Sequence, residues 1–479
     1  MPCRDHTGGT IQIAQRVGRG PTLCATARRK ALPHILTNAP HHMSILRPID
    51  KDILRIALPA IVTNITVPLL GLVDLAITGH IGSASYIGAI AVGGMIFNVV
   101  YWVFGFLRMG TSGMTSQALG RADYAEAVRL LLRSLTVGLA VGLCLVAARR
   151  PLLAVAVRVI GADGDLLPLV HTYYNICVWG APAMLCLYGL TGWFIGMQDT
   201  KATMVVSVSQ NVVNIAASLL LVYGAGMSID GVATGTLVAQ YAGLVIAIAL
   251  LTVRYRWLRP WVRLRGTLRG GAMRRFFTVN RDIFLRTLFL VAVNLFFVSA
   301  GTSQGTGVLA VNTLLMQLFT LFSYVMDGFA FAGEALCGKC KGAADTDGLM
   351  RTIRRLMAWG CWLATAYTLM YVCGGEAFLS LLTDDAGLLH LSHSYMAWAM
   401  AIPAAGMAAF VWDGVFVGIT DTRGMLISSV VASALFFMVY AAASPLMHNH
   451  GLWLAFIVYL TARGAVQTVI FRCRRAAGR

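Results

Sequence analysis

Long apolar runs alternate with short polar loops along almost the whole chain. Most runs hold about 20 residues or more, which is the length that an α-helix needs to cross a bilayer. Polar residues do not recur at every second position, as they would in a membrane β-barrel. The pattern predicts an all-α polytopic membrane protein. We expect twelve transmembrane helices, at 52–79, 86–118, 128–149, 168–197, 203–223 and 229–253, and then at 280–302, 307–336, 352–374, 388–418, 425–445 and 451–471.

One segment occurs twice, as Gly-Trp-Phe-Ile-Gly-Met-Gln-Asp-Thr-Lys from Gly192 and as Gly-Val-Phe-Val-Gly-Ile-Thr-Asp-Thr-Arg from Gly414 (414 − 192 = 222). A repeat within a hydrophobic chain is typical of secondary transporters, whose halves move against each other around a central site. Because each half has six helices, the two halves are parallel repeats. We expect an N-lobe at 51–253 and a C-lobe at 280–471.

The two copies of the repeat differ at several polar positions, and the residues at these positions are candidate functional residues. Asp413 falls opposite Thr191, and we expect Gln117 to fall opposite Glu334. The aspartates of the repeated segment, Asp199 and Asp421, are expected to cap the helices that follow them.

Composition agrees with a membrane protein, because 58% of the 479 residues are hydrophobic and 12% are charged. Much of the net charge of +18 lies in loops on one predicted face, in an Arg-rich connector at 254–279 and in a basic tail at 472–479. This distribution follows the positive-inside rule and places both termini in the cytoplasm. The third loop is the exception, with Arg149, Arg150 and Arg158. Nucleic acid is therefore not an expected partner.

Residues 1–50 form a polar segment, which we expect to be a disordered tail or to precede a true start at Met43. Cys337 and Cys340 have the spacing of a zinc or redox pair, but no second pair lies near them in sequence to complete a site. No nucleophile–base pattern or phosphate loop occurs. We expect neither a metal site nor a cofactor, and we do not expect an enzyme.

Ionisable residues within the spans are functional candidates, because each costs roughly 2.5–3.5 kcal/mol near the centre of a bilayer. Asp74 lies on the first helix after Pro59 and Pro68, which bend it, and it is a candidate proton or cation site. Its alternative role is a hydrated acid near the outer mouth.

The second half carries three further acids. Asp327 and Glu334 lie seven residues apart on one helix face, and Asp413 precedes the repeated segment. We expect them to line a cavity. Arg108 and Arg286 are candidates for neutralising buried acids; their alternative role is structural pairing or snorkelling to the interface.

Several motifs resemble the multidrug and toxic compound extrusion (MATE) family and, within it, the DinF-like branch. The resemblance covers residues 50 to about 470. It rests on Ala57-Leu58-Pro59 with Val73-Asp74, on Gly105–Gly110 with Gln117–Gly120, on Asp327–Ala330 with Gly333–Leu336, on Asp413–Phe416, and on both Gly-x-x-Asp-Thr repeats.

The resemblance implies two six-helix lobes around a central cleft. It implies a monomer in the bacterial inner membrane that exports amphipathic small molecules, often lipophilic cations, in exchange for protons or sodium ions. Membrane lipids are then its remaining partners. A flippase for lipid-linked precursors or polysaccharides is the alternative within the same superfamily, but such proteins usually carry an Arg-rich cavity. The spans here offer more carboxylates than arginines.

Individual positions match the family only in part. Asp74 matches the acid thought to take the coupling ion, and Asn214 matches the Asn of the helix-five Asn-x-x-x-Asp motif, whose Asp is replaced by Ser218. A helix-six Thr corresponds to either Thr234 or Thr236. A helix-seven Glu has no equivalent, and Asn294 is the nearest polar residue. Sodium prefers several oxygens with a fixed negative charge, whereas a proton needs one acid. We therefore expect proton coupling, with sodium coupling as the alternative.

Overall fold

The computed structural model describes residues 47–79, 84–160, 166–262, 267–268 and 270–477. The predicted tail at 1–50 therefore lies almost wholly outside the described residues, and the first helix begins at Pro48.

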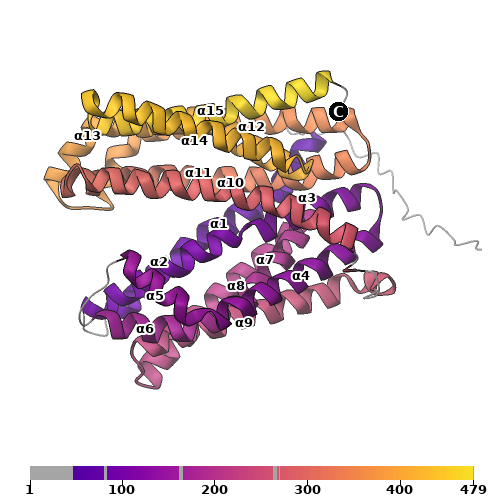
Figure 1. The fold of residues 1–479 in the computed structure, drawn as a ribbon, viewed down its shortest axis with the longest axis horizontal. Coiled ribbons are helices and arrows are strands. Elements are labelled where there is room, and N and C mark those ends of the chain that lie inside the picture. Colours follow the sequence, from indigo (N-terminus) through magenta and orange to yellow (C-terminus); the bar gives the residue numbers. More distant parts are fainter. Residues whose placement is uncertain (1–46, 80–83, 161–165, 263–266, 269, 478–479) are drawn as a thin grey trace, which may run out of the picture. The chain divides into compact units, whose positions relative to one another are not determined.

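The first half holds α1 (Pro48–Gly79), α2 (Ala84–Phe104), α3 (Phe106–Gly120), α4 (Tyr124–Ala147), α5 (Arg149–Ile160), α6 (Leu166–Cys177), η1 (Val178–Gly180), α7 (Ala181–Gly196), α8 (Thr200–Leu219), η2 (Leu220–Gly224) and α9 (Ile229–Arg254) (Figure 1). After η3 (Arg256–Trp261), the second half holds α10 (Gly270–Thr302), α11 (Thr306–Gly342), α12 (Thr346–Ser380), α13 (Ala386–Gly418), α14 (Thr422–Met447) and α15 (Asn449–Ala476).

The predicted twelve-span architecture is confirmed. Among the described residues, 11 helical spans are long and apolar enough to cross a membrane. Three of them join consecutive elements: α2 continues into α3, α6 continues through η1 into α7, and α8 continues into η2. The 32 residues of α1 give about 48 Å of helix and supply the twelfth span.

Two elements differ from the sequence prediction. The third loop contains a further helix, α5, which is too short to register as a span. Helix α10 begins at Gly270 rather than at 280, inside the predicted connector. Its first turns are amphipathic, because Phe276 and Val279 are buried while Arg274 and Arg275 are exposed. The two arginines interrupt the apolar run, so the sequence pattern placed the start of the helix too late.

The 222-residue repeat is visible in the backbone. Ala122 and Ala344 both have φ 56°, and Gln198 (φ 63°) corresponds to Thr420 (φ 55°) at the same offset (344 − 122 = 222). After each of these left-handed residues, an aspartate caps the next helix by accepting a hydrogen bond from a main-chain N–H; the four caps are Asp123, Asp199, Asp345 and Asp421. The predicted caps at Asp199 and Asp421 are therefore confirmed.

Glycines set the close approach of α3 and α11, and they do so symmetrically. A Cβ on Gly120 would overlap the carbonyl oxygen of Lys339, and a Cβ on Gly342 would overlap that of Gln117. Adding 222 to Gly120 and Gln117 gives Gly342 and Lys339, so each contact is the repeat equivalent of the other. This is expected for a pseudo-twofold axis between parallel repeats.

The same contacts correct one sequence alignment. Gly196 packs on the carbonyl of Ser112, while Gly418 packs on that of Glu334 (334 − 112 = 222). Ser112 therefore lies opposite Glu334, and Gln117 lies opposite Lys339. The predicted pairing of Gln117 with Glu334 was wrong because it ignored the constant offset.

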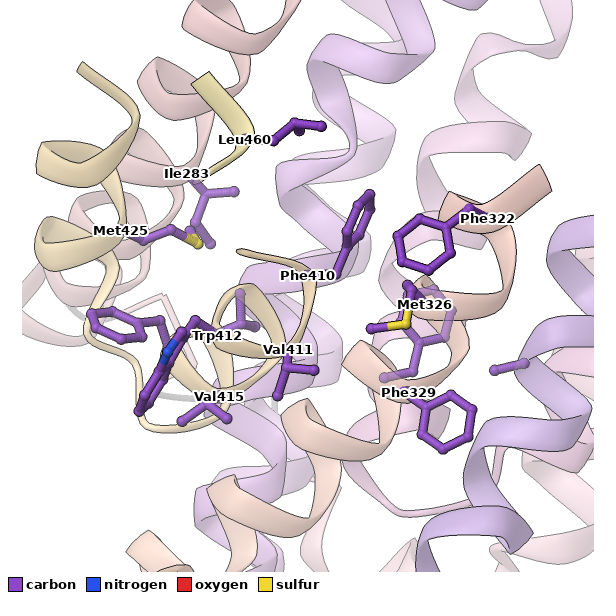
Figure 2. Packing of buried hydrophobic residues seen from close by; sticks show 14 of the residues in the cluster. Ile283, Phe322, Met326, Phe329, Phe410, Val411, Trp412, Val415, Met425 and Leu460 are labelled. Carbon is purple, nitrogen blue, oxygen red and sulfur yellow. The ribbon is translucent and has the colours of Figure 1, made fainter. Parts of the chain in front are cut away.

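The largest apolar core crosses from one half to the other. It includes Ile53 and Ala57 of α1 and Leu107 of α3 together with residues of α10, α11, α13 and α15. Figure 2 shows its C-terminal part, where Phe410 of α13 meets Phe322 of α11 edge to face at 5.9 Å between ring centroids. Helices α1 and α3 pack along α11, and Arg108 of α3 is thereby brought next to Glu334 of α11.

Candidate functional site

A buried ion cluster lies between α10, α13 and α15. Asp413 is 6% exposed, and its carboxylate forms ion pairs with Arg286 and Arg463. Gln467 Nε2 donates to Asp413 Oδ1 at 2.7 Å. A buried carboxylate with two guanidinium partners has its charge fully compensated. The expected role of Arg286 in neutralising a buried acid agrees with this geometry.

A second ion pair crosses between the halves. Arg108 on α3 approaches Glu334 on α11 with 3.5 Å between Nη1 and Oε2. Neither of these two atoms has a hydrogen-bond partner within the described part of the chain. The Arg108 guanidinium also lies over the Phe331 ring, 4.2 Å from its centroid. The pair is therefore held by charge and an aromatic face, and it lacks a close hydrogen bond.

The third acid of the cluster has no such partner. Asp327 is half-buried on α11, and among the described residues it has neither an ion pair nor a hydrogen bond. The charges of Arg108, Asp413, Arg286 and Glu334 act on it electrostatically. The two ion-paired groups and Asp327 together hold three acids and three arginines, and Asp327 is the acid without an ion pair among the described residues.

Arg463 and Gln467 were missed by the sequence reasoning. An arginine within the last apolar span costs as much to bury as an aspartate, so the same criterion that selected Asp74 applies to it. Arg463 lies about midway along α15, in Thr461-Ala462-Arg463-Gly464. The excess of carboxylates over arginines that the sequence suggested is absent from this cluster.

A separate polar cluster lies within the first half. Asn214 Nδ2 on α8 donates to Thr236 Oγ1 on α9 at 3.1 Å. Ser218, one turn after Asn214, packs against Gly235, and both Asn214 and Ser218 are 0% exposed. Asn214 Oδ1 and Ser218 Oγ have no hydrogen-bond partner among the described residues. This contact identifies Thr236, rather than Thr234, as the threonine of the cluster.

The remaining candidates lie elsewhere. Asp74 is part of α1, but its side chain lies outside the described residues. Gln117 Nε2 bridges the halves by donating to the Gly418 carbonyl at 2.9 Å and to Thr420 Oγ1 at 3.0 Å. Asn294 donates to the Leu290 carbonyl of its own helix at 2.9 Å. Within the described part of the chain, neither Gln117 nor Asn294 forms a hydrogen bond with the ion cluster.

A further ion pair joins the start of α1 to α12. Arg355 donates to both carboxylate oxygens of Asp50, at 2.9 and 2.8 Å, and Trp359 Nε1 donates at 3.0 Å. Burial raises the pKa of Asp50, but the hydrogen bonds from Arg355 and Trp359 outweigh it and hold the pKa below the ordinary value. This pair, like Gln117, ties the two halves together at one end of the bundle.

No metal chemistry is evident in the described part of the chain, where no group of three or more His, Cys, Asp or Glu residues could hold a metal ion. Cys337 and Cys340 carry free thiols, and Cys337 is buried.

Comparison with known proteins identifies the family. The MatE family pattern matches residues 59–220 and 283–442, one match in each half. DNA damage-inducible protein F of Escherichia coli (strain K12) is 34% identical over 90% of this chain and 94% of that protein. Multidrug resistance protein MdtK of Edwardsiella ictaluri is 23% identical over 88% of this chain and 95% of that protein. A solved structure of a multidrug resistance MATE family transporter in an outward-facing conformation shares the fold, with a TM-score of 0.80, 19% identity and coverage of 89% and 96%. The chain therefore belongs to the MatE family and is a multi-pass membrane transporter.

Proposed function

We propose that this transporter is a proton-coupled antiporter that exports amphipathic small molecules, including lipophilic cations, from the cytoplasm. The proposal places the basic loops and both termini in the cytoplasm. The relatives named for multidrug resistance support the cargo class. Asp327 supports a place for a cationic group, since it has no ion pair among the described residues while Glu334 and Asp413 are already paired with arginines.

The main support for proton coupling is the chemistry of the polar cluster formed by Asn214, Ser218 and Thr236. Asn214, Ser218 and Thr236 offer neutral oxygens, so Asp74 is the one carboxylate that this proposal assigns to the coupling site. A single acid binds and releases a proton without any further ligand, whereas a sodium site needs several oxygens around a fixed charge. The two unpartnered oxygens, Asn214 Oδ1 and Ser218 Oγ, favour sodium as the second candidate.

The free energy available to drive export depends on the net charge that the exchange moves across the membrane. One proton exchanged for one monovalent cation moves no net charge, so only the pH gradient drives it, at about 1.4 kcal/mol per pH unit. A neutral cargo would also gain from the membrane potential, at about 2.3 kcal/mol per 100 mV.

Purified protein in liposomes tests the proposal, with proton and sodium gradients imposed independently. We expect dye transport to follow the pH gradient and to fall at least tenfold in Asp74→Asn. Asp52→Asn is the matched control, because Asp52 is an exposed acid at the start of the same helix. Transport driven by sodium at equal pH, or a parent rate in Asp74→Asn, would contradict proton coupling.

A further inference from the structure

A basic cavity lies on the first half, and its lining includes no residue of the ion cluster. Its volume is about 750 Å³, and α5, α6 and the turn that follows α6 line it. Three arginines line it together with His171 and Trp179. These arginines, Arg149, Arg150 and Arg158, are the ones that depart from the positive-inside pattern. The proposed transport mechanism gives them no role.

The amphipathic character of α5 builds the cavity. Leu153 is 4% exposed and belongs to a buried core, on which Ala156 and Val157 also pack. Arg150 and Arg158 lie beside this apolar stripe, eight residues and about two turns apart, and they line the same cavity as Leu153 and Val157. Both are exposed. The helix thus docks by its apolar face and presents two cations to the cavity.

These cations lack acidic partners in the described part of the chain. Arg149 lies over the Trp179 ring, 5.3 Å from its centroid, and neither Arg150 nor Arg158 forms an ion pair there. Asp163 and Asp165 follow in the sequence but lie outside the described residues. A cavity with three guanidinium groups attracts an anion, and guanidinium geometry matches phosphate.

The position of the cavity indicates which anion. Helix α4 has 24 residues, or about 36 Å, so α5 lies a full bilayer thickness from the basic turn at Arg121. On the proposed orientation this is the outer interface. Trp179 is 49% exposed, as is typical of aromatic residues at the headgroup level. Leu153, Val157 and Leu167 add apolar walls, which a freely soluble anion does not require.

We propose that this cavity binds an anionic phospholipid of the outer leaflet. The lipid phosphate lies between Arg150 and Arg158, Arg149 and Trp179 flank the headgroup, and the apolar walls contact the glycerol and upper acyl carbons. The assignment to the outer leaflet rests on the proposed orientation of the chain, with both termini in the cytoplasm. Lipid binding itself is independent of which ion drives transport.

Native mass spectrometry of the purified full chain tests this. Phosphatidylglycerol and phosphatidylcholine with identical acyl chains are titrated against the parent and against Arg150→Gln/Arg158→Gln. We expect phosphatidylglycerol to bind the parent more tightly, and its affinity to fall about thirtyfold in the double variant, which corresponds to about 1 kcal/mol per arginine. Arg150→Lys/Arg158→Lys should recover most of the affinity. Thermal unfolding verifies that each variant is folded.

Arg256→Gln/Arg259→Gln is the matched control, since it removes the same charge from exposed positions in η3. An equal loss of affinity in this control would overturn the proposal by showing a general charge effect. Displacement of the lipid by millimolar inorganic phosphate would assign the cavity to a soluble anion instead. Binding that occurs only in Asp163→Asn/Asp165→Asn would show that the chain's own acids occupy the arginines.

Discussion

Gly120 of α3 lies so close to the carbonyl of Lys339 on α11 that a single methyl group does not fit between them. The atoms that a Cβ would meet are main-chain atoms, which cannot swing aside. We expect Gly120→Ala to separate the two helices, to lower the thermal unfolding midpoint and to reduce transport. Gly342→Ala should have the same effect, because its contact with Gln117 is equivalent.

Gly374→Ala provides the control for these substitutions. No atom lies within 4 Å of a Cβ at Gly374, which is inside α12. Alanine is favoured over glycine in a helix by up to about 1 kcal/mol, so this variant should be unchanged or more stable. Equal destabilisation by all three variants would contradict the steric argument.

The Asp413 cluster predicts strong coupling between its members. Replacing Asp413 leaves two buried arginines without their carboxylate, and replacing Arg463 leaves Asp413 with Arg286 alone. Breaking a buried ion pair by removing one partner typically costs about 3–5 kcal/mol. We expect Asp413→Asn and Arg463→Met each to lower the unfolding midpoint sharply, and the double variant to lose less than the sum. A double-mutant cycle on unfolding measures this coupling. Additive losses would show that the two side chains act independently.

The Asp50–Arg355 pair predicts a pH dependence in the acidic range. Because the pKa of Asp50 is lowered in the folded protein, its contribution to stability is complete above the unfolded value of about 3.9 and is lost as the pH falls through the folded value. Unfolding midpoints of the parent and of Asp50→Asn should therefore differ by a constant amount from pH 5 to 8. The difference should shrink below about pH 4.

Asp52→Asn is the reference for that series, since Asp52 is exposed two residues away. It should match the parent at every pH. A parent-to-Asp50→Asn difference that persists unchanged at pH 3 would contradict the assignment.

The lack of an ion pair at Asp327 among the described residues predicts a selective transport defect. Asp327→Asn removes the one acid of the cluster that has no arginine partner in the described chain, so cationic dyes should lose affinity while neutral cargo is little affected. We expect the KM for a cationic dye to rise about tenfold. Asp347→Asn, an exposed acid at the start of α12, is the matched control. A similar loss for neutral and cationic cargo would argue against a direct ionic contact.

Local signals account for what the sequence predicted well. Apolar runs and the repeated Asp-Thr turns fix the spans and the caps, because both depend on neighbouring residues only. The pairs Arg463–Asp413 and Arg355–Asp50 join positions 50 and 305 residues apart, so they depend on how helices pack. Helix α5 was missed because its 12 residues are too few to span a bilayer. The choice between Thr234 and Thr236 needed the position of Asn214 on a neighbouring helix.

The paired glycines at 120 and 342 bear on how a chain with two similar halves can form by duplication of one six-helix unit. A contact that maps onto itself under the repeat is self-complementary, like the isologous interface of a twofold dimer. One six-helix unit with this surface already has a fitting partner in a second copy of itself. Joining two copies end to end then requires no new interface, and each half is afterwards free to change its polar residues separately, as Asp413 and Thr191 have done.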